Sequence, residues 1–239
     1  MFSDPVLITG AGRRVGLHLA RRLLQDGARV IAHYRSSGEN LETLRAEGAQ
    51  LVQGDLATVD GSLAVAEAVR AMTPALRAIV HNASAFSPTA DDPREAASQF
   101  IQFFGIHMQA PWLLNTTLEP LLRASASHPA DIVHITDIFA ERPHPEFDLY
   151  CATKAGLENL SLSLARRLAP RIKVNCIRPG PILFMPSHTP EARAKVLAET
   201  PLGREGGPEP VYRALRALLD NDFITGAALP VDGGRHLAR

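Results

Sequence analysis

Three side chains stand at spacings that suit proton-transfer chemistry: Asp137, Tyr150 and Lys154. Tyr150 and Lys154 are four residues apart in a stretch predicted as a long helix over 149–168, so they lie on one face of that helix. A lysine ammonium beside a phenol favours the phenolate and eases release of the phenolic proton. Tyr150 is therefore a candidate proton donor, with Lys154 as its electrostatic partner.

Asp137 directly follows a strand predicted over 131–136. An ionised aspartate can only accept hydrogen bonds, so beside a ketone oxygen it would repel the negative charge that develops there during reduction. It suits a substrate that carries N–H or amino groups instead. The alternative interpretation is that Asp137 is a local cap or turn residue, and the residues around it leave both interpretations open.

Size and composition exclude several classes of protein. A chain of 239 residues with ordinary hydrophobic content predicts one α/β domain whose core needs no disulfides. The formal charge of zero removes any electrostatic argument for binding nucleic acid or an anionic membrane, and no apolar run approaches the length of a membrane span. Cys151 and Cys176 lack metal-type spacing, so we expect no metal site. With a strand predicted from residue 5, there is no room for a signal peptide, and we expect a cytoplasmic protein.

Short apolar runs alternate with helical patterns along the whole chain. Strands are predicted over 5–9, 28–33, 49–53, 76–81, 131–136, 171–177 and 227–231. Helices are predicted over 17–26, 41–47, 61–72, 96–104, 110–122, 149–168, 191–198 and 210–219. This alternation predicts a single-domain, Rossmann-type, doubly wound parallel sheet of about seven strands with helices on both faces. Ligands of such sheets bind at the carboxyl ends of the strands, and we expect the irregular stretch 181–205 to be a substrate lid.

Glycines at 10, 12 and 16 lie between the first predicted strand and the first helix. Glycines at this place let the backbone turn sharply and approach a pyrophosphate, which the helix N-terminus attracts. The spacing is G-x-G-x-x-x-G, which is looser than the usual dinucleotide fingerprint. Dinucleotide binding is the favoured interpretation, and a merely structural turn is the alternative.

The second predicted strand ends in His33, Tyr34, Arg35 and Ser36. An NAD site places a carboxylate at this point to hold the ribose 2′-hydroxyl, and none is present here. Arg35 and Ser36 suit a 2′-phosphate, to which Arg13 or Arg14 would add charge. These residues favour NADPH over NADH, with a solvated arginine at a strand end as the alternative.

Two further motifs end strands at the same expected edge of the sheet. They are Asp55-Leu56 and Asn82-Ala83-Ser84. Taken singly, Asp55 would serve equally well as a helix cap, and Asn82 as a turn residue.

In combination these motifs resemble the short-chain dehydrogenase/reductase family. The resemblance covers almost the whole chain and is carried by Thr9–Gly16, Asp55-Leu56, Asn82-Ala83, Tyr150 with Lys154, and Arg178-Pro179-Gly180. It implies a Rossmann-type fold, dependence on NAD(P), and assembly as a homodimer or homotetramer, of which we favour the tetramer.

Departures from the common family pattern point to its pteridine reductase branch. The family usually has Gly where this chain has Arg14, Gly where it has Ser84, and Ser where it has Asp137. The branch has an Asp-Tyr-Lys set and stacks its pterin between the nicotinamide and a phenylalanine, a position that Phe86 matches. The resemblance therefore implies NADPH-dependent reduction of a pterin or folate substrate, such as dihydromonapterin, dihydrobiopterin or dihydrofolate, with Asp137, Tyr150 and Lys154 as catalytic residues.

The same resemblance implies the ligand contacts. NADPH is expected to contact Gly10, Arg13, Arg14, Val15, His33, Tyr34, Arg35, Ser36, Asp55, Leu56, Asn82, Ala83, Ser84, Tyr150, Lys154, Pro179, Gly180 and Ile182. The substrate is expected to contact Arg14, Ser84, Phe86, Asp137 and Tyr150.

One departure leaves a question open. His107 stands where the wider family has an Asn that supports a proton relay to the lysine, so we do not count His107 as catalytic and expect it to be structural. Two rival functions stay open as well. They are a carbonyl or 3-oxoacyl reductase of the same family, and a non-catalytic NADP-sensing module, although binding alone would need no proton donor.

Overall fold

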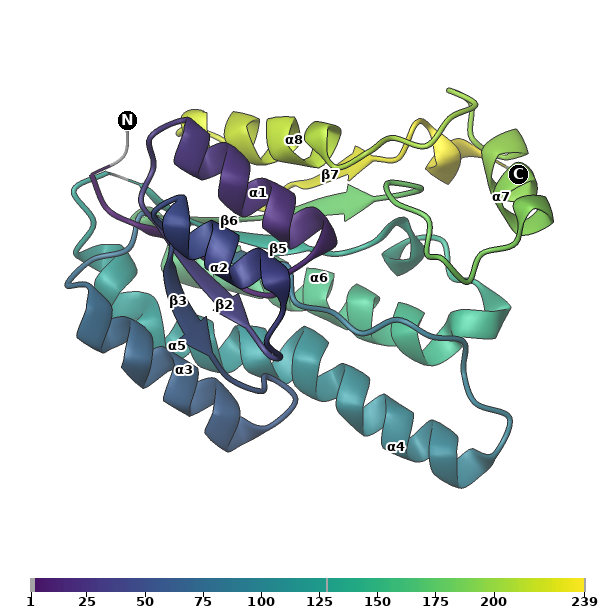
Figure 1. Ribbon diagram of the computed structural model, residues 1–239, viewed down its shortest axis with the longest axis horizontal. Coiled ribbons are helices and arrows are strands. Elements are labelled where there is room, and N and C mark those ends of the chain that lie inside the picture. Colours follow the sequence, from purple (N-terminus) through teal and green to yellow (C-terminus); the bar gives the residue numbers. More distant parts are fainter. Residues whose placement is uncertain (1–2, 128, 239) are drawn as a thin grey trace.

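The computed structural model describes residues 3–127 and 129–238, and within them it forms one parallel sheet (Figure 1). The strands are β1 (Val6–Ile8), β2 (Val30–Tyr34), β3 (Gln50–Gln53), β4 (Ala78–His81), β5 (Ala130–Ile135), β6 (Ile172–Pro179) and β7 (Ala228–Val231). Their order is β3-β2-β1-β4-β5-β6-β7, with all neighbours parallel. The chain therefore winds outward in both directions from the junction of β1 and β4, which confirms the predicted fold class.

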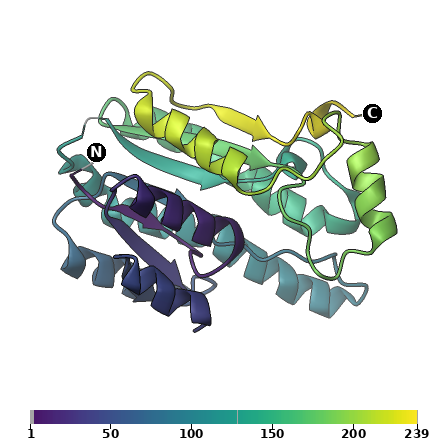
Figure 2. The same ribbon diagram turned by 45° about the horizontal axis from the view of Figure 1, so that its top comes forward.

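Helices cover both faces of this sheet (Figures 1 and 2). One face carries α1 (Arg14–Gln25), α2 (Glu39–Ala46) and α8 (Glu209–Asp220), and the other carries α3 (Val59–Met72), α5 (Ala110–Arg123) and α6 (Asp148–Leu168). The strands read as continuous apolar runs because alternate residues enter opposite cores. In β1, Val6 and Ile8 pack on the side of α1 and α8, whereas Leu7 packs on the side of α3 and α5.

Local sequence signals set the starts of several helices. The side chain of Thr58 accepts a hydrogen bond from the N–H of Gly61 and caps α3. Asp92 caps α4 (Pro93–Phe104), and Thr189 caps α7 (Pro190–Ala198), in each case with a proline in the first turn, where its missing N–H is not needed. Asp55, considered above as a helix cap, is therefore not the cap of α3.

The long helical stretch from α4 to α5 runs through a π-helical turn, η1 (Gly105–Gln109). The sequence predicts two separate helices here, over 96–104 and 110–122, and the π turn is the junction between them. Pro111 lies in the first turn of α5, where proline is tolerated. Gly105 opens the π turn beneath the β3–α3 loop, since a Cβ there would meet the carbonyl oxygen of Ala57 at 2.6 Å. The turn carries His107 into the interior, and π turns occur frequently at functional sites.

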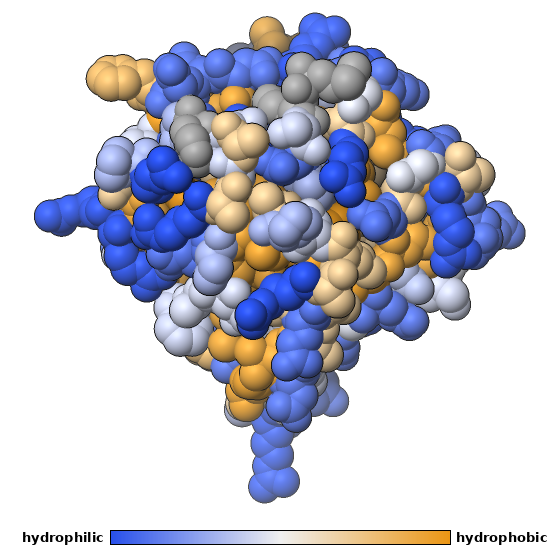
Figure 3. All heavy atoms as spheres, turned by 90° about the vertical axis from the view of Figure 1, so that its left-hand side faces the viewer, coloured by the Kyte–Doolittle hydropathy of each residue, from blue (hydrophilic) through white to orange (hydrophobic). Residues whose placement is uncertain are grey.

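Charged side chains are buried at the amino ends of the strands, opposite the ligand-binding edge. Asp131 lies 2.5 Å from Arg77 and 2.9 Å from Lys173. The two cations also donate to the carbonyl oxygens of Leu218, Leu219 and Asn221 at the end of α8. This triad ties the carboxyl end of α8 to the sheet. The outer surface at this end is mostly hydrophilic, with smaller hydrophobic areas showing between the charged groups (Figure 3).

The carboxyl edge carries the connections that the sequence predicts to be functional. The stretch 181–205 contains α7 and lies beside the C-terminal turn η4 (Arg235–Leu237) in both ribbon views (Figures 1 and 2). Arg235 pairs with Glu199 at 3.0 Å, which joins the end of α7 to η4. Across the described ranges, no helix has the length and apolar character required to cross a membrane.

Candidate active site

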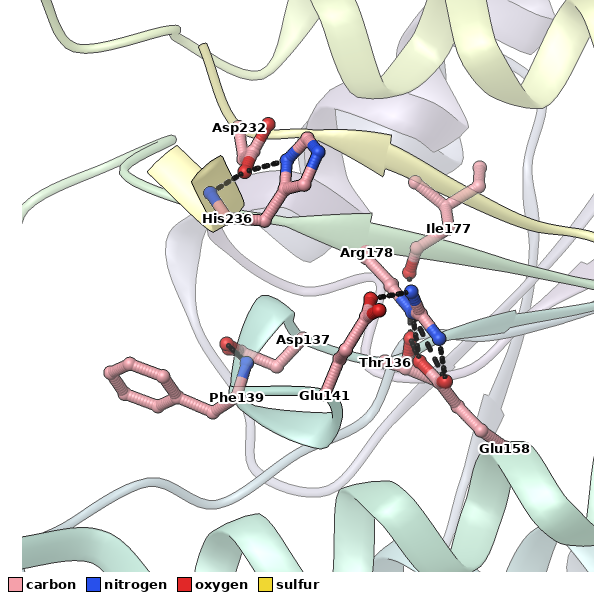
Figure 4. A network of polar contacts seen from close by, with 9 residues as sticks. All are labelled: Thr136, Asp137, Phe139, Glu141, Glu158, Ile177, Arg178, Asp232 and His236. Atoms are coloured by element: carbon pink, nitrogen blue, oxygen red, sulfur yellow. Dashed lines mark hydrogen bonds and ion pairs between the residues drawn. The ribbon is translucent and has the colours of Figure 1, made fainter. Parts of the chain in front are cut away.

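The fold brings Asp137 and Tyr150 into direct contact at the end of β5. The hydroxyl of Tyr150 donates to Oδ2 of Asp137 at 2.9 Å, while Oδ1 of Asp137 accepts the N–H of Phe139 at 2.9 Å. The second contact caps the short turn η2 (Ile138–Ala140) and is visible in Figure 4. The carboxylate of Asp137 thus caps its own loop, as the alternative interpretation predicts, and it also contacts the phenol, while its role toward a substrate stays a prediction.

Burial and the neighbouring Asp137 carboxylate raise the pKa of Tyr150 well above its ordinary value. Burial also raises the pKa of Asp137. This corrects the sequence-based expectation that Lys154 makes the phenol more acidic. The ammonium of Lys154 lies 5.6 Å from the centre of the Tyr150 ring and donates to the carbonyl oxygen of Ile135 at 3.0 Å. Tyr150 is thus a fully protonated phenol at neutral pH, which is the form that a proton donor needs.

Lys154 is 2% exposed. Burial lowers its pKa to about 8, although the carboxylates of Asp137 and Glu158 act in the opposite direction. The ammonium therefore begins to lose its proton only slightly above neutral pH, and any interaction that depends on its charge must weaken there.

A clamp around Arg178 holds the loop that carries Asp137 (Figure 4). The guanidinium of Arg178 is bidentate on Glu158, with contacts of 2.8 and 2.6 Å, and also pairs with Glu141. Thr136 donates to the same Glu158 carboxylate at 2.7 Å. The clamp connects β5, the η2 loop, α6 and β6 next to the phenol. Sequence reasoning missed its role, although Glu158 lies four residues after Lys154 on the same helix face and would have been the signal.

The turn after β1 is held from two sides. The N–H of Gly10, which has φ +67°, donates to Nδ1 of His33 at 3.1 Å, and Nε2 of His33 lies 3.1 Å from the carbonyl oxygen of Gly54. The amide of Asn82 donates to the carbonyl oxygens of Thr9 and Gly10. The His33 side chain is 2% exposed, and burial lowers its pKa to about 4. Both His33 and Asn82 thus support the glycine turn, and His33 has no ring nitrogen left for a ligand.

Arg14 is the one non-glycine residue with positive φ, 52°, among the described residues. Left-handed backbone costs a residue with a Cβ about 1 to 2 kcal/mol, and such strain concentrates at functional sites. Its guanidinium donates to the carbonyl oxygen of Leu183 at 2.6 Å, so it links the glycine turn to the predicted lid. Arg14, Arg13, Arg35 and Ser36 are all exposed at this end of the sheet.

The other residues predicted to contact the cofactor lie on loops at the same edge. Asp55 accepts the N–H of Ala57 at 3.0 Å, and the N–H of Ala83 donates to Thr9 at 3.0 Å. Gly180 packs against Asp232, since a Cβ on it would lie 2.5 Å from that side chain. The remaining members, none of them fully exposed, are Val15, Tyr34, Leu56, Pro179 and Ile182.

This arrangement fits a dinucleotide with a 2′-phosphate. A Cβ on Gly10 would lie 2.8 Å from Ala83, so the two loops approach as closely as backbone allows. The N-terminus of α1 follows at Arg14, and one exposed arginine, Arg35, stands at the end of β2 with no carboxylate at that position. No group of three or more potential metal ligands occurs in the ranges that the structure covers.

Aromatic rings form the wall beside the phenol. Phe86 stacks on Phe147 with ring centres 4.7 Å apart and meets the edge of Tyr150 at 4.9 Å. Phe139 and Phe103 extend the same cluster. The structure therefore places Phe86 next to Tyr150, and one face of its ring is covered by Phe147, which sequence reasoning missed.

This combination of doubly wound sheet, glycine turn and Tyr-Lys helix defines a class of nicotinamide-dependent oxidoreductases. A family model described as "Enoyl-(Acyl carrier protein) reductase" matches residues 10–236. The chain belongs to the short-chain dehydrogenase/reductase family, whose members use NAD or NADP.

Relatives of similar length are named dihydromonapterin reductase. The protein of Citrobacter koseri is 42% identical over 234 residues, covering 98% of this chain and 97% of the relative. That of Escherichia coli O6:H1 is 41% identical over 236 residues, covering 98% of both.

Solved structures share the fold over the whole chain. FolM alternative dihydrofolate reductase 1 from Brucella canis, complexed with NADP, has a TM-score of 0.86 and 31% identity, with 99% of this chain and 96% of that chain covered. The Pseudomonas aeruginosa RhlG/NADP complex has a TM-score of 0.89 and 28% identity, with 99% and 97% covered.

The titration of Lys154 yields a prediction for cofactor binding. We expect the Kd for NADPH, measured by fluorescence titration, to rise as the pH passes about 8, because the ammonium is lost there. Lys154→Arg should keep the affinity constant over that range, since a guanidinium stays protonated. Lys154→Met should weaken binding about tenfold or more at neutral pH, the equivalent of one charge-assisted hydrogen bond, and its difference from the wild type should shrink as the pH passes about 8.

Lys154→Met, which should weaken cofactor binding, should by contrast increase the stability of the fold. A lysine whose pKa is lowered by folding destabilises the native state at any pH below its folded pKa. This effect fades as the pH rises from the folded pKa to the ordinary pKa of lysine. Lys154→Met should therefore raise the Tm at neutral pH.

A wild-type Kd for NADPH that does not change as the pH passes about 8 would contradict the assignment of a functional ammonium to Lys154.

Proposed function

We propose that this protein is an NADPH-dependent dihydropterin reductase that converts dihydromonapterin, dihydrobiopterin or dihydrofolate to the tetrahydro form. The observation that carries the proposal is the 2.9 Å contact between the Asp137 carboxylate and the Tyr150 phenol at the carboxyl end of β5. A ketone reductase would need a hydrogen-bond donor at the position of Asp137, and an ionised carboxylate is only an acceptor. The names of the relatives from Citrobacter koseri, Escherichia coli and Brucella canis support the same class of substrate.

The side chains divide the chemistry between them. A dihydropterin presents ring N–H and amino groups, which Asp137 is placed to accept, and a C=N bond. Bound NADPH supplies the hydride to the carbon of that bond. Tyr150 holds the proton for the adjacent nitrogen, because burial and Asp137 keep its pKa well above the ordinary value. Lys154 binds the nicotinamide ribose, and Arg14, Ser84 and Phe86 complete the pocket.

The end of β2 supports the choice of NADPH. Arg35 and Ser36 are exposed there, and the strand ends without the carboxylate that would hold a ribose 2′-hydroxyl. A guanidinium binds a phosphate through two parallel hydrogen bonds, so Arg35 would carry most of the preference.

Replacing Arg35 tests that preference. We expect Arg35→Ala to lower kcat/KM for NADPH by about tenfold to a hundredfold, through loss of a charged hydrogen-bonding pair, and to leave kcat/KM for NADH almost unchanged. Arg45→Ala is the matched control, because Arg45 is an exposed arginine on α2 whose one ion pair within the described part of the chain is with Glu42 in its own helix. Equal losses for both cofactors would show that Arg35 does not read the 2′-phosphate.

The substrate is tested by steady-state oxidation of NADPH with dihydromonapterin, dihydrobiopterin, dihydrofolate and a panel of ketones. We expect turnover of at least one dihydropterin, and a loss of about a hundredfold in Asp137→Ala, because the substrate loses a charged acceptor. Asp137→Ser should gain ketone activity at the expense of pterin activity, since serine can donate to a carbonyl oxygen. Good turnover of ketones with no turnover of any dihydropterin would favour a carbonyl or 3-oxoacyl reductase instead. Tight binding of NADPH with no turnover of any substrate, together with no effect of Tyr150→Phe on that binding, would favour an NADP-sensing module.

We also propose that the protein is a cytoplasmic homotetramer. Apolar side chains are exposed on α4 (Phe100, Ile101 and Phe104) and in the C-terminal part of the chain, on β7 and its flanking segments (Phe223, Leu229 and Leu237). The helix α4 and the strand β7 lie on opposite sides of the molecule (Figure 1). Two self-complementary faces generate a tetramer, whereas one face would generate only a dimer. Both cysteines are free and buried, which suits a reducing compartment.

The assembly is tested by sedimentation velocity. We expect Ile101→Asp to reduce the tetramer to a dimer, because Ile101 is 73% exposed and a carboxylate there would be buried unpaired in an interface. Leu63→Asp, at a partly exposed position on α3, is the control. A monomeric wild-type protein would contradict the proposal.

A further inference from the structure

The buried imidazole of His107 contacts the site through Ser84. His107 is 1% exposed and lies in the π turn between α4 and α5. Its Nδ1 lies 2.8 Å from the hydroxyl of Thr153, and its Nε2 lies 2.8 Å from the hydroxyl of Ser84 and 3.3 Å from the backbone N–H of Ala85. Its ring stacks on Phe103 and meets the edge of Tyr150.

The partners of the ring determine its tautomer. Thr153 donates its only hydroxyl proton to the carbonyl oxygen of Tyr150 at 2.8 Å, so its oxygen must accept from Nδ1–H of His107. The N–H of Ala85 can only donate, so Nε2 of His107 must present a lone pair. Burial, together with the nearby charge of Lys154, lowers the pKa of His107 well below its ordinary value, in agreement with a neutral ring.

This tautomer decides which way the Ser84 hydroxyl points. A lone pair on Nε2 at 2.8 Å is a better acceptor for the Ser84 proton than the carbonyl oxygen of Ala85 at 3.3 Å. The lone pairs of the Ser84 oxygen are then free to face the exposed side of the loop. A hydrogen bond from Ser84 acts to lower the pKa of the Tyr150 phenol, although burial and Asp137 raise that pKa more strongly. The Ser84 hydroxyl has one proton, and its 2.8 Å contact with Nε2 of His107 directs that proton to the imidazole.

We propose that His107 is a positioning residue that acts through Ser84: by accepting the hydroxyl proton of Ser84, it presents the Ser84 oxygen to the substrate as a hydrogen-bond acceptor. With Asp137, this places two acceptors beside the phenol of Tyr150, a pair that favours ligands with N–H donors over ligands with carbonyl oxygens. The choice of substrate in this inference rests on the proposed function, whereas the arrangement of hydrogen bonds does not.

The first experiment measures the tautomer without reference to activity. We expect the ¹⁵N NMR spectrum of histidine-labelled protein to show His107, assigned by its loss in His107→Gln, as the neutral Nδ1–H tautomer throughout the neutral pH range. Ser84→Ala should move the Nε2 resonance of His107 and leave its Nδ1 resonance in place, because it removes the shorter of the two contacts of Nε2 and neither Thr153 nor the Ala85 N–H. An Nε2–H tautomer, or no response to Ser84→Ala, would overturn the inference even if His107→Asn proves unable to fold.

The second experiment is a double-mutant cycle. Asn places a polar atom near the Nδ1 position and Gln places one near the Nε2 position, so His107→Gln can keep the contact with Ser84 while His107→Asn cannot. We expect Ser84→Ala and His107→Asn each to lower kcat/KM for dihydromonapterin by about tenfold, the equivalent of one hydrogen bond, and the double variant to lose little more than either. His107→Gln should stay within about threefold of wild type.

Two further readouts separate positioning from a purely structural role. In a Lys154→Arg background, where residue 154 no longer titrates near pH 8, the alkaline limb of the pH profile should move to lower pH in His107→Asn, because the released Ser84 hydroxyl can then donate to the Tyr150 phenolate. The control is His81→Asn, which removes another buried histidine, one bonded to Asn115 at 2.7 Å, and its effect should multiply with that of Ser84→Ala. Independent effects of His107→Asn and Ser84→Ala, or an unmoved pH profile, would overturn the inference.

If the wild-type protein reduces no dihydropterin, the proposed function fails. The NMR result then still decides whether His107 sets the orientation of Ser84.

Discussion

The hydrogen bond between the Tyr150 phenol and the Asp137 carboxylate is the constraint around which the rest of the site is arranged. A carboxylate beside a buried phenol opposes its ionisation, so the pair keeps the proton on Tyr150 at neutral pH. The same pair can orient a substrate only if that substrate brings hydrogen-bond donors. In the proposed reaction, this one contact would keep the proton donor protonated and would disfavour simple carbonyl compounds.

Maintaining that contact requires support from parts of the chain that lie far apart. Oδ1 of Asp137 is anchored on its own loop, and the loop is clamped to α6 and β6 through Arg178 and Glu158. Lys154 is buried beside the pair with one backbone carbonyl as its partner, at a position where an apolar residue would be more favourable for stability. The carboxyl edge therefore gives up some stability for function, as active sites commonly do.

Buried charge serves a different purpose at the other end of the sheet. Asp131 is paired there with both Arg77 and Lys173, and the cations also cap the last carbonyls of α8. These three charged groups form ion pairs with one another, and the two cations also bind carbonyl oxygens of α8. Around Tyr150, by contrast, the Asp137 carboxylate accepts from a phenol and a backbone N–H and forms no ion pair within the described residues. Burial of a charged group therefore does not by itself mark a functional site, because the amino end buries its charges in ion pairs.

Periodicity in the sequence was sufficient for the sheet, because a strand buried on both faces must be continuously apolar and the helices between strands must be amphipathic. It also placed Asp137, Tyr150 and the glycine turn at one edge, since the carboxyl ends of parallel strands meet there. The sequence could not reveal that burial overrides the effect of Lys154 on the phenol, or that His33 supports the glycine turn. Nor could it reveal that Glu158 and Arg178 hold the loop of Asp137, or that His107 contacts Ser84 on a neighbouring loop. Desolvation and hydrogen-bond partners depend on which residues the crossovers between strands bring together, and local patterns carry no record of those distant neighbours.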